Sequence, residues 1–360
     1  MRSVVYREPG RFAGWPANYG MWHWGEEVVL IFAAGWVGAD TGLHPRDKSR
    51  PFLPMVARSR DGGSNWTEEP FTGVVPGGVE TLSGDEHVDP PLQIGPRLSD
   101  DDFVPVPDGV DFADPETIVL CGRTGITVGS RSWFYLSRDR ARSWSGPHVI
   151  PQLGSTAVSA RTDVIPLGGA EALFQLTVGK SDGTEGRILT AWTGDGGRSF
   201  ERRSWVGEEP DGWAIMPSST TLADRTIVTA RRCAGHDHDH QWVHWIDLYA
   251  SADQGRSWHR RGTPVAATGS GGNPPALIRV GDGRLVLVYG SRAEPYGLRS
   301  AVSADDGHSW TASVITDDVA DRDMGYPRAV AMEDGSVLAV FYANSSARSE
   351  RHIEAVRWTP

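Results

Sequence analysis

The stretch SADDGHSW at residues 303–310 is the last of five octets that share one pattern. Each octet has Ser or Thr first, Asp third, a small polar residue seventh and an aromatic residue last, and four of the five have Gly fifth. The other four are residues 59–66, 137–144, 193–200 and 251–258. An Asp carboxylate accepts hydrogen bonds from the backbone N–H groups of a turn, and Gly supplies the positive φ that a tight turn needs. The octet therefore predicts a hairpin turn whose aromatic residue packs between neighbouring sheets.

The octets start 52 to 78 residues apart, which is the length of one supersecondary unit of four strands and their turns. Between the octets lie runs rich in β-branched and aromatic residues, bounded by turn residues. These runs are residues 26–35, 131–137, 186–193, 225–232, 284–290 and 336–343. No amphipathic run is long enough for a helix. We therefore predict an all-β, six-bladed β-propeller, in which five blades carry octets and the sixth spans about residues 324–358.

The ends of the chain are predicted to meet in the sixth blade. This last blade is short of sequence for a fourth strand, and residues 3–6 (SVVY) are suited to supply it and close the ring without an exposed edge. One propeller then accounts for residues 1–360 as a single domain. The acidic, Pro-rich residues 75–112 interrupt the repeat. We expect a surface loop around the second blade, although a lid or a subunit contact also fits.

The net charge and the cysteine count exclude some classes of binding partner and cross-link. A net charge of −11 argues against a nucleic acid or an anionic membrane. Two cysteines, Cys121 and Cys233, are too few for a disulfide framework, and the first ten residues have no apolar segment. We therefore expect a cytoplasmic protein, or a secreted one if a signal segment has been removed. The alternating run HDHDH at residues 236–240 points its side chains apart, so we expect a solvated loop there, and neither a metal site nor a cofactor.

The face opposite the octets collects charged loops and the starts of the innermost strands. Several Arg and Lys residues converging in an acidic protein indicate an anionic ligand, most simply a carboxylate held by guanidinium groups. Aromatic residues among them suit the apolar face of a sugar ring. The candidate binding residues on this face are Trp15, Arg161, Asp163, Lys180, Arg231, Asn273, Arg292 and Tyr296.

The octets resemble the Asp-box, also called the bacterial neuraminidase repeat, of the sialidase superfamily. The resemblance covers nearly the whole chain, and segments such as RFAGWPANYG and MGYPRAV are similar to a sialidase-like subgroup. It implies a propeller that binds or cleaves sugars. Sialidases use three arginines on the sugar carboxylate, a Tyr nucleophile paired with a Glu, and an Asp as acid/base.

Carried over by position, the resemblance implies that Arg231 and Arg292 hold a carboxylate, that Tyr326 is the nucleophile and that Asp40 or Asp47 is the acid. Two positions depart from the family pattern. The sequence GWP at residues 14–16 stands where sialidases have an Arg-Ile-Pro-like motif. The sequence IMPS at residues 215–218 stands where the Glu partner of the tyrosine is expected.

These residues support three functional hypotheses. The first is a glycoside hydrolase acting on a small acidic saccharide, sialic- or uronic-acid-containing, with Asp47 or His44 as acid/base and Tyr326, activated by Glu185 or Asp163, as nucleophile.

The second hypothesis is a lyase acting on a uronate. Tyr326 or His44 is then the base, and Arg161, Arg231 and Lys180 neutralise the carboxylate. The third is a glycan-binding propeller without catalytic activity. The sequence leaves the choice among the three, the substrate and the oligomeric state open.

Overall fold

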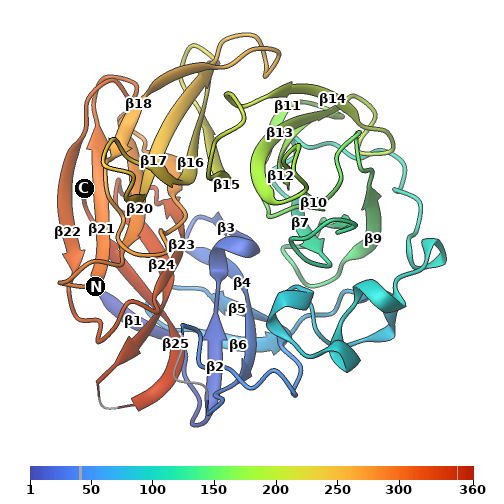
Figure 1. Ribbon diagram of the computed structural model, residues 1–360, viewed down its shortest axis with the longest axis horizontal. Coiled ribbons are helices and arrows are strands. Elements are labelled where there is room, and N and C mark those ends of the chain that lie inside the picture. The colour runs from blue at the N-terminus through green and yellow to red at the C-terminus, as the bar shows by residue number, and fades with distance from the viewer. Residues whose placement is uncertain (40–42, 347) are drawn as a thin grey trace.

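The computed structural model describes residues 1–39, 43–346 and 348–360. Its sheets are arranged in a ring around a central axis, with their innermost strands toward the middle (Figure 1). The described residues form 25 strands and six 3-10 helices of three residues each. No described helix has the length and apolar character needed to cross a membrane. The predicted all-β propeller is therefore confirmed, whereas the predicted number of blades is wrong.

Four blades are separate sheets. The first contains β7 (Ile118–Arg123), β8 (Ser132–Ser137) and β9 (Ser145–Ile150). The second contains β10 (Val158–Ser159), β11 (Val164–Gly168), β12 (Glu171–Gly179), β13 (Glu185–Thr193) and β14 (Glu201–Trp205). The third contains β15 (Trp213–Thr221), β16 (Ile227–His236), β17 (Trp242–Ser251) and β18 (His259–Val265). The fourth contains β19 (Ala276–Arg279), β20 (Leu285–Ser291), β21 (Gly297–Ser303) and β22 (Thr311–Thr316).

The two ends of the chain share one nine-stranded sheet. Its strands are β1 (Arg2–Tyr6), β2 (Arg11–Gly14), β3 (Met21–Trp24), β4 (Glu27–Trp36), β5 (Leu53–Ser59), β6 (Thr67–Pro70), β23 (Gly325–Ala331), β24 (Val337–Ser345) and β25 (Arg348–Trp358).

Six separate blades are not observed: four sheets stand alone as blades, and the remaining strands form one sheet because β2 pairs in parallel with β25, with Phe12 opposite Arg351. This pairing joins the stretches that the sequence analysis counted as the first and sixth blades. The N-terminal strand β1 also pairs with β25, antiparallel, with Ser3 opposite Ala355. Strand β25 therefore has partners along both of its edges, which leaves no open edge between the chain ends.

The segment 75–112 contains 3-10 helices and no strand among the described residues. The helices are η2 (Pro76–Gly78), η3 (Asp85–His87), η4 (Pro90–Leu92), η5 (Gly95–Arg97) and η6 (Asp100–Asp102). The segment runs alongside β9, where the Val104 N–H donates to the Pro147 carbonyl at 3.0 Å. It then reaches the next blade, where the Phe112 N–H donates to the Gly169 carbonyl at 2.7 Å.

The octets form turns of one construction. In the last octet, Ser303 Oγ donates to Asp305 Oδ1 at 2.8 Å and the Ser309 N–H donates to the same oxygen at 2.8 Å. The aromatic residue of the fourth octet bridges two blades, because Trp258 Nε1 donates to Thr190 Oγ1 and Ser204 Oγ of the preceding blade. The octets are thus turns that fasten neighbouring sheets together.

Candidate functional site

A strained residue followed by proline occurs three times: Trp15 precedes helix η1 (Pro16–Asn18) after the end of β2, Met216 lies inside β15, and Tyr326 is the second residue of β23. Trp15, Met216 and Tyr326 have φ values of 57°, 51° and 50°, in the left-handed region that residues other than Gly and Asn seldom occupy. The register of β15 shifts between Ile215 and Ser218, and that of β23 shifts in the same way after Gly325. Such bulges re-aim a side chain, and strain of this kind is concentrated at functional sites.

Asn273 fixes the strained backbone around Tyr326. Its Oδ1 accepts the Tyr326 N–H at 2.9 Å, and its Nδ2 donates to the Met324 carbonyl at 3.0 Å. The intervening Gly325 has a φ of 104°, and a Cβ there would meet the Asn273 amide at 2.2 Å. Only glycine therefore fits between the amide and the tyrosine. Asn273 is fully buried, and its two hydrogen bonds hold the backbone on both sides of Gly325 in place.

Arginines surround the half-buried Tyr326 side chain. Arg232 Nη1 donates to the tyrosine oxygen at 3.0 Å, and the guanidinium groups of Arg232 and Arg292 lie 5.5 and 5.6 Å from the ring centre. Burial raises the pKa of the Tyr326 hydroxyl, but the charges of Arg232, Arg292 and Arg161 outweigh it and lower the pKa below the usual tyrosine value. The phenolate form is thus favoured more here than in an ordinary tyrosine.

Two further arginines carry carboxylate partners. Arg161 Nη1 donates to Glu185 Oε1 at 2.7 Å, and its Nε donates to Asn18 Oδ1 at 3.3 Å. Arg123 pairs with Glu86, which comes from helix η3 of the 75–112 segment. These pairs place two carboxylates and two guanidinium groups near the Arg232–Tyr326 contact.

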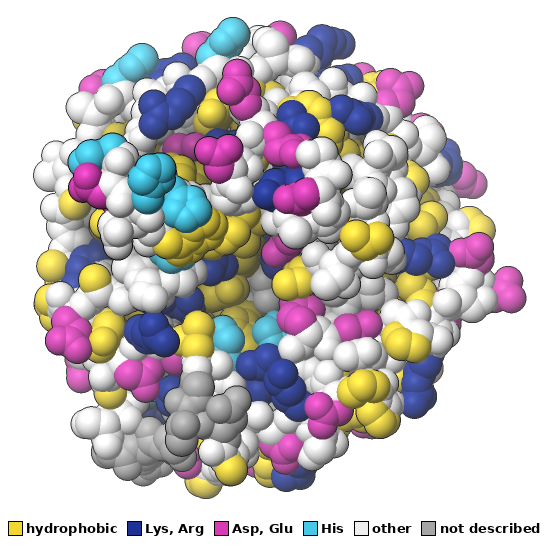
Figure 2. Space-filling model, viewed as in Figure 1, with side chains coloured by type: hydrophobic (Ala, Val, Ile, Leu, Met, Phe, Trp, Pro, Cys, Tyr) yellow, Lys and Arg dark blue, Asp and Glu magenta, His cyan; other side chains and the backbone are white. Residues whose placement is uncertain are grey.

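Several polar atoms around this cluster have no hydrogen-bond partner among the described residues. They include Arg123 Nε, Arg232 Nε and Glu86 Oε2, all of them buried. The face of the molecule above the ring centre is hollowed, and Lys or Arg, His and hydrophobic side chains lie around the hollow (Figure 2). Unpaired donors of buried guanidinium groups are costly unless an anion or another acceptor meets them.

His44 belongs to a second hydrogen-bonded network, which is centred on Asp323. His44 Nδ1 contacts Asp323 Oδ1 at 2.5 Å, and Asp323 also accepts hydrogen bonds from Tyr342 and Arg351. Burial is the main reason that the pKa of His44 lies below the usual histidine value, and Asp323 opposes that shift. Neutral His44 is therefore favoured at neutral pH. Its Nε2 makes no hydrogen bond among the described residues.

Five of the sequence-predicted residues come together here, namely Tyr326, Arg292, Arg161, Glu185 and Asn273. His44 lies in the adjoining network around Asp323. Trp15 is 1% exposed and stacks on His87 with ring centres 4.0 Å apart, so it packs beneath the site and offers no platform for a sugar.

Arg231 is placed differently from the expectation. Its Nε and Nη2 donate to Asp247 at 2.9 and 2.7 Å, and its Nη1 donates to the Val206 carbonyl. Consecutive residues of a strand point to opposite faces, so Arg231 and Arg232 cannot both face the hollow. The structure places Arg232 against Tyr326.

Three other predicted residues make local contacts instead. Asp47 accepts hydrogen bonds from Ser49, Lys180 pairs with Asp182 at 3.2 Å, and the Tyr296 hydroxyl donates to Glu294. Each of these partners lies two residues away in the sequence, and Lys180 Nζ also donates to the Asp211 carbonyl at 3.5 Å. Asp40, the other acid implied by the resemblance, lies outside the described residues.

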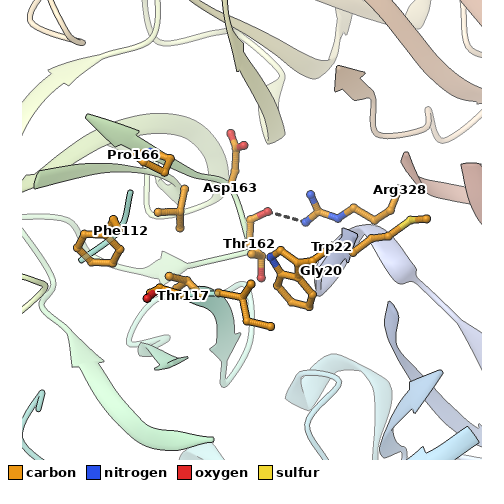
Figure 3. A pocket seen from close by; sticks show the side chains of 12 residues that line it. Gly20, Trp22, Phe112, Thr117, Thr162, Asp163, Pro166 and Arg328 are labelled. Atoms are coloured by element: carbon orange, nitrogen blue, oxygen red, sulfur yellow. Dashed lines mark hydrogen bonds between the residues drawn. The ribbon is translucent and has the colours of Figure 1, made fainter. Parts of the chain in front are cut away.

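Asp163 is also turned away from Tyr326. Both of its oxygens accept hydrogen bonds from Ser219, and burial raises the pKa of its carboxyl to about 6. It lines a separate cavity of about 240 Å³ together with Arg328 and Trp22 (Figure 3). Arg328 donates to the Thr162 carbonyl beside it at 2.5 Å. Asp163 therefore cannot activate the tyrosine as expected.

The sequence analysis did not select Arg232, Arg123, Glu86 or His87. Arg232 could have been found only by knowing the register of β16. Glu86 and His87 belong to the segment taken for a surface loop, and no pattern in that segment indicates that η3 turns inward. No described group of His, Cys, Asp and Glu could hold a metal ion.

Comparisons with known proteins agree with this architecture. A crystal structure of a protein of unknown function from Dyadobacter fermentans is similar with a TM-score of 0.73 at 17% identity, covering 99% of this chain and 97% of that one. An α-L-arabinanase of Penicillium chrysogenum in complex with arabinobiose is similar with a TM-score of 0.59 at 12% identity, covering 99% and 97%. A Trypanosoma rangeli sialidase in complex with sialic acid is similar with a TM-score of 0.54 at 11% identity, covering 99% of this chain and 58% of that one.

Identities this low establish the fold and not the activity. No curated protein matches the chain significantly in sequence. The profile of the BNR repeat-like domain matches residues 110–340, which is more than half of the chain. The chain therefore belongs to the BNR repeat-like domain family, with the fold of the sialidase-type β-propellers.

Proposed function

We propose that this protein is a carbohydrate-active enzyme that acts on an acidic sugar at the hollow above Tyr326. The observation that carries the proposal is the contact between Arg232 and the Tyr326 hydroxyl at 3.0 Å, with Arg292 and Arg161 close enough to lower the tyrosine pKa. The arginines would hold the sugar carboxylate, and they also favour the reactive phenolate. One cluster therefore combines a binding and a chemical role.

Hydrolysis is the first form of this proposal. The Tyr326 oxygen would attack the anomeric carbon, and a second group would protonate the departing glycosidic oxygen. Glu185 is the candidate for that proton transfer, because it is partly exposed and keeps one carboxylate oxygen without a partner among the described residues. Neutral His44, which is also partly exposed, would instead accept a proton from the water of the second step. Water would then release the sugar from the tyrosine.

Elimination is the second form, and one observation favours it. Among the described residues, no carboxylate accepts a hydrogen bond from the Tyr326 hydroxyl, whose one hydrogen-bond partner is Arg232. A phenolate stabilised by arginines can take the proton beside a uronate carboxylate, since the same arginines neutralise the negative charge that develops. The glycosidic bond would then break to leave an unsaturated sugar.

The test uses acidic glycosides and their analogues in which the carboxylate is reduced to an alcohol. Wild-type protein should strongly prefer the acid, and Arg232→Ala should lose roughly 2–5 kcal/mol of transition-state binding for the acid only. Arg232→Lys should recover little, because an ammonium group cannot make the planar two-pronged contact.

Arg322→Ala is the matched control, because the Arg322 side chain is exposed and, among the described residues, donates a hydrogen bond only to Ser270 Oγ. Equal discrimination between acid and alcohol by wild type and Arg232→Ala would contradict the proposal. Ultraviolet absorbance of an unsaturated uronate identifies elimination, and its absence from the products identifies hydrolysis.

A further inference from the structure

One face of the third blade carries a row of aromatic and imidazole rings. His236 of β16 lies directly opposite Trp242 of β17, and Ala234 lies opposite His244. Trp213 of β15 also lies opposite Ala234. Directly opposed residues of antiparallel strands point to the same face of a sheet. Two tryptophans and two histidines therefore share this face, with the small Ala234 between them.

The row begins at the proposed catalytic cluster. The Arg232 guanidinium lies 4.9 Å from the centre of the Trp213 ring. From there the ring centres follow at 5.7 Å to His244, 6.3 Å to Trp242 and 5.0 Å to His236. Each ring is thus in contact with the next, from the arginine beside the tyrosine out to the tip of the β16–β17 hairpin.

The outer end of the row is open to a ligand. Trp242 is 47% exposed and is the one aromatic residue among the large hydrophobic side chains that the described residues leave exposed. Histidine and hydrophobic side chains lie side by side at the edge of the hollow (Figure 2). Burial and the charges of Arg232 and Arg292 lower the pKa of His244 to about 4, so that its ring is neutral at neutral pH. Neutral rings with an exposed face suit the C–H faces of sugars.

We propose that this row, from Trp213 through His244 to Trp242, binds the sugar units that follow the acidic one, so that the substrate is the end of an acidic oligosaccharide chain. The inference rests on the proposed function, because the row is continuous with the Arg232 end of that site. A simple acidic glycoside would fill the hollow and leave Trp242 unused. A chain would extend along the rings and gain affinity with each unit that contacts one.

The experiment measures chain-length dependence. A panel of sialyl-oligosaccharides, oligogalacturonates and oligoglucuronates, each in a short and a long form, is assayed for binding by calorimetry and for turnover. Wild type should prefer the long form of the accepted sugar. Trp242→Ala should lose roughly three- to ten-fold in affinity and kcat/KM for the long form and less than about two-fold for the short form. Trp242→Phe should recover most of the loss.

Trp36→Ala is the matched control. Trp36 is a half-buried tryptophan whose ring is covered by the guanidinium groups of Arg11 and Arg50, at 4.2 and 3.3 Å from its centre. Any loss of affinity or kcat/KM caused by Trp36→Ala should be the same for the short and the long form. The inference would be overturned if wild type bound and processed long forms no better than short forms. It would also be overturned if Trp242→Ala kept the preference for long forms. In either case, turnover of short forms would leave the proposed function intact. Failure of every form, short and long, to bind or react would instead overturn the proposed function.

Discussion

The two faces of the ring use the same residue types in opposite ways. On the turn face, each octet carboxylate is satisfied within its own octet: Asp253 accepts hydrogen bonds from Ser251 and Ser257, and Asp305 repeats the arrangement with Ser303 and Ser309. On the hollowed face, charged groups come from different sheets, and several of their atoms have no partner among the described residues. Local, repeated and complete hydrogen bonding builds the fold, whereas convergent and incomplete hydrogen bonding indicates a ligand site.

Tyr326→Phe should show the contrast between the two faces most clearly, because it should affect activity strongly and stability little. Removing the hydroxyl should reduce turnover roughly 10²- to 10⁴-fold, because the proposed nucleophile or base is lost. The melting temperature should change little, since the ring remains. Tyr296→Phe is the control, as its hydroxyl contacts only Glu294 among the described residues. Normal turnover by Tyr326→Phe would remove the tyrosine from the mechanism.

Arg231→Ala tests the contrast between neighbouring residues of one strand. It leaves the buried Asp247 carboxylate without its bidentate partner, which should cost about 3–5 kcal/mol in the free energy of unfolding. Arg232→Ala should cost much less stability and most of the activity. Urea unfolding and kinetics on both variants give the comparison. Equal loss of stability in the two would mean that Arg232 is also structural.

Trp258→Ala tests the turn face. The half-buried ring packs between blades and donates to Thr190 and Ser204, so its removal should cost about 2–4 kcal/mol in the free energy of unfolding. The protein that remains folded should keep the wild-type kcat and KM. A selective loss of activity at unchanged stability would contradict a purely structural role for the octets.

Asp163 gives the smallest effect, and it depends on pH. Its pKa of about 6 in the folded protein is higher than in an unfolded chain, so the folded state binds the proton more tightly. Stability should therefore fall by about 2–3 kcal/mol as pH rises from about 4 to 6. Asp163→Asn should lack this component when unfolding is measured across that range. Parallel pH profiles for wild type and variant would show that the carboxyl titrates normally.

Much of the fold was predictable because it depends on patterns of residues that are close together in the sequence. The octets, the six expected strand runs and the absence of long helices all depend on neighbours in sequence. Strands β4, β8, β13, β16, β20 and β24 cover those runs with boundaries that differ by a few residues. Tyr326 and Asn273 were also accessible from the sequence, because the GYP and GNP segments mark the starts of innermost strands.

The remaining features depended on contacts that no local pattern encodes. The single parallel pair between Phe12 and Arg351 merged the ends of the chain into one sheet. The inward turn of η3 brought Glu86 to Arg123.

The choice between Arg231 and Arg232 depended on one step of strand register, since side chains alternate between faces and a shift of one residue exchanges them. Sequence by itself thus determined the all-β repeat and the chemical types available on the hollowed face. Only the tertiary structure decided which members of that set meet, because convergence in space is set by register and sheet pairing between distant segments.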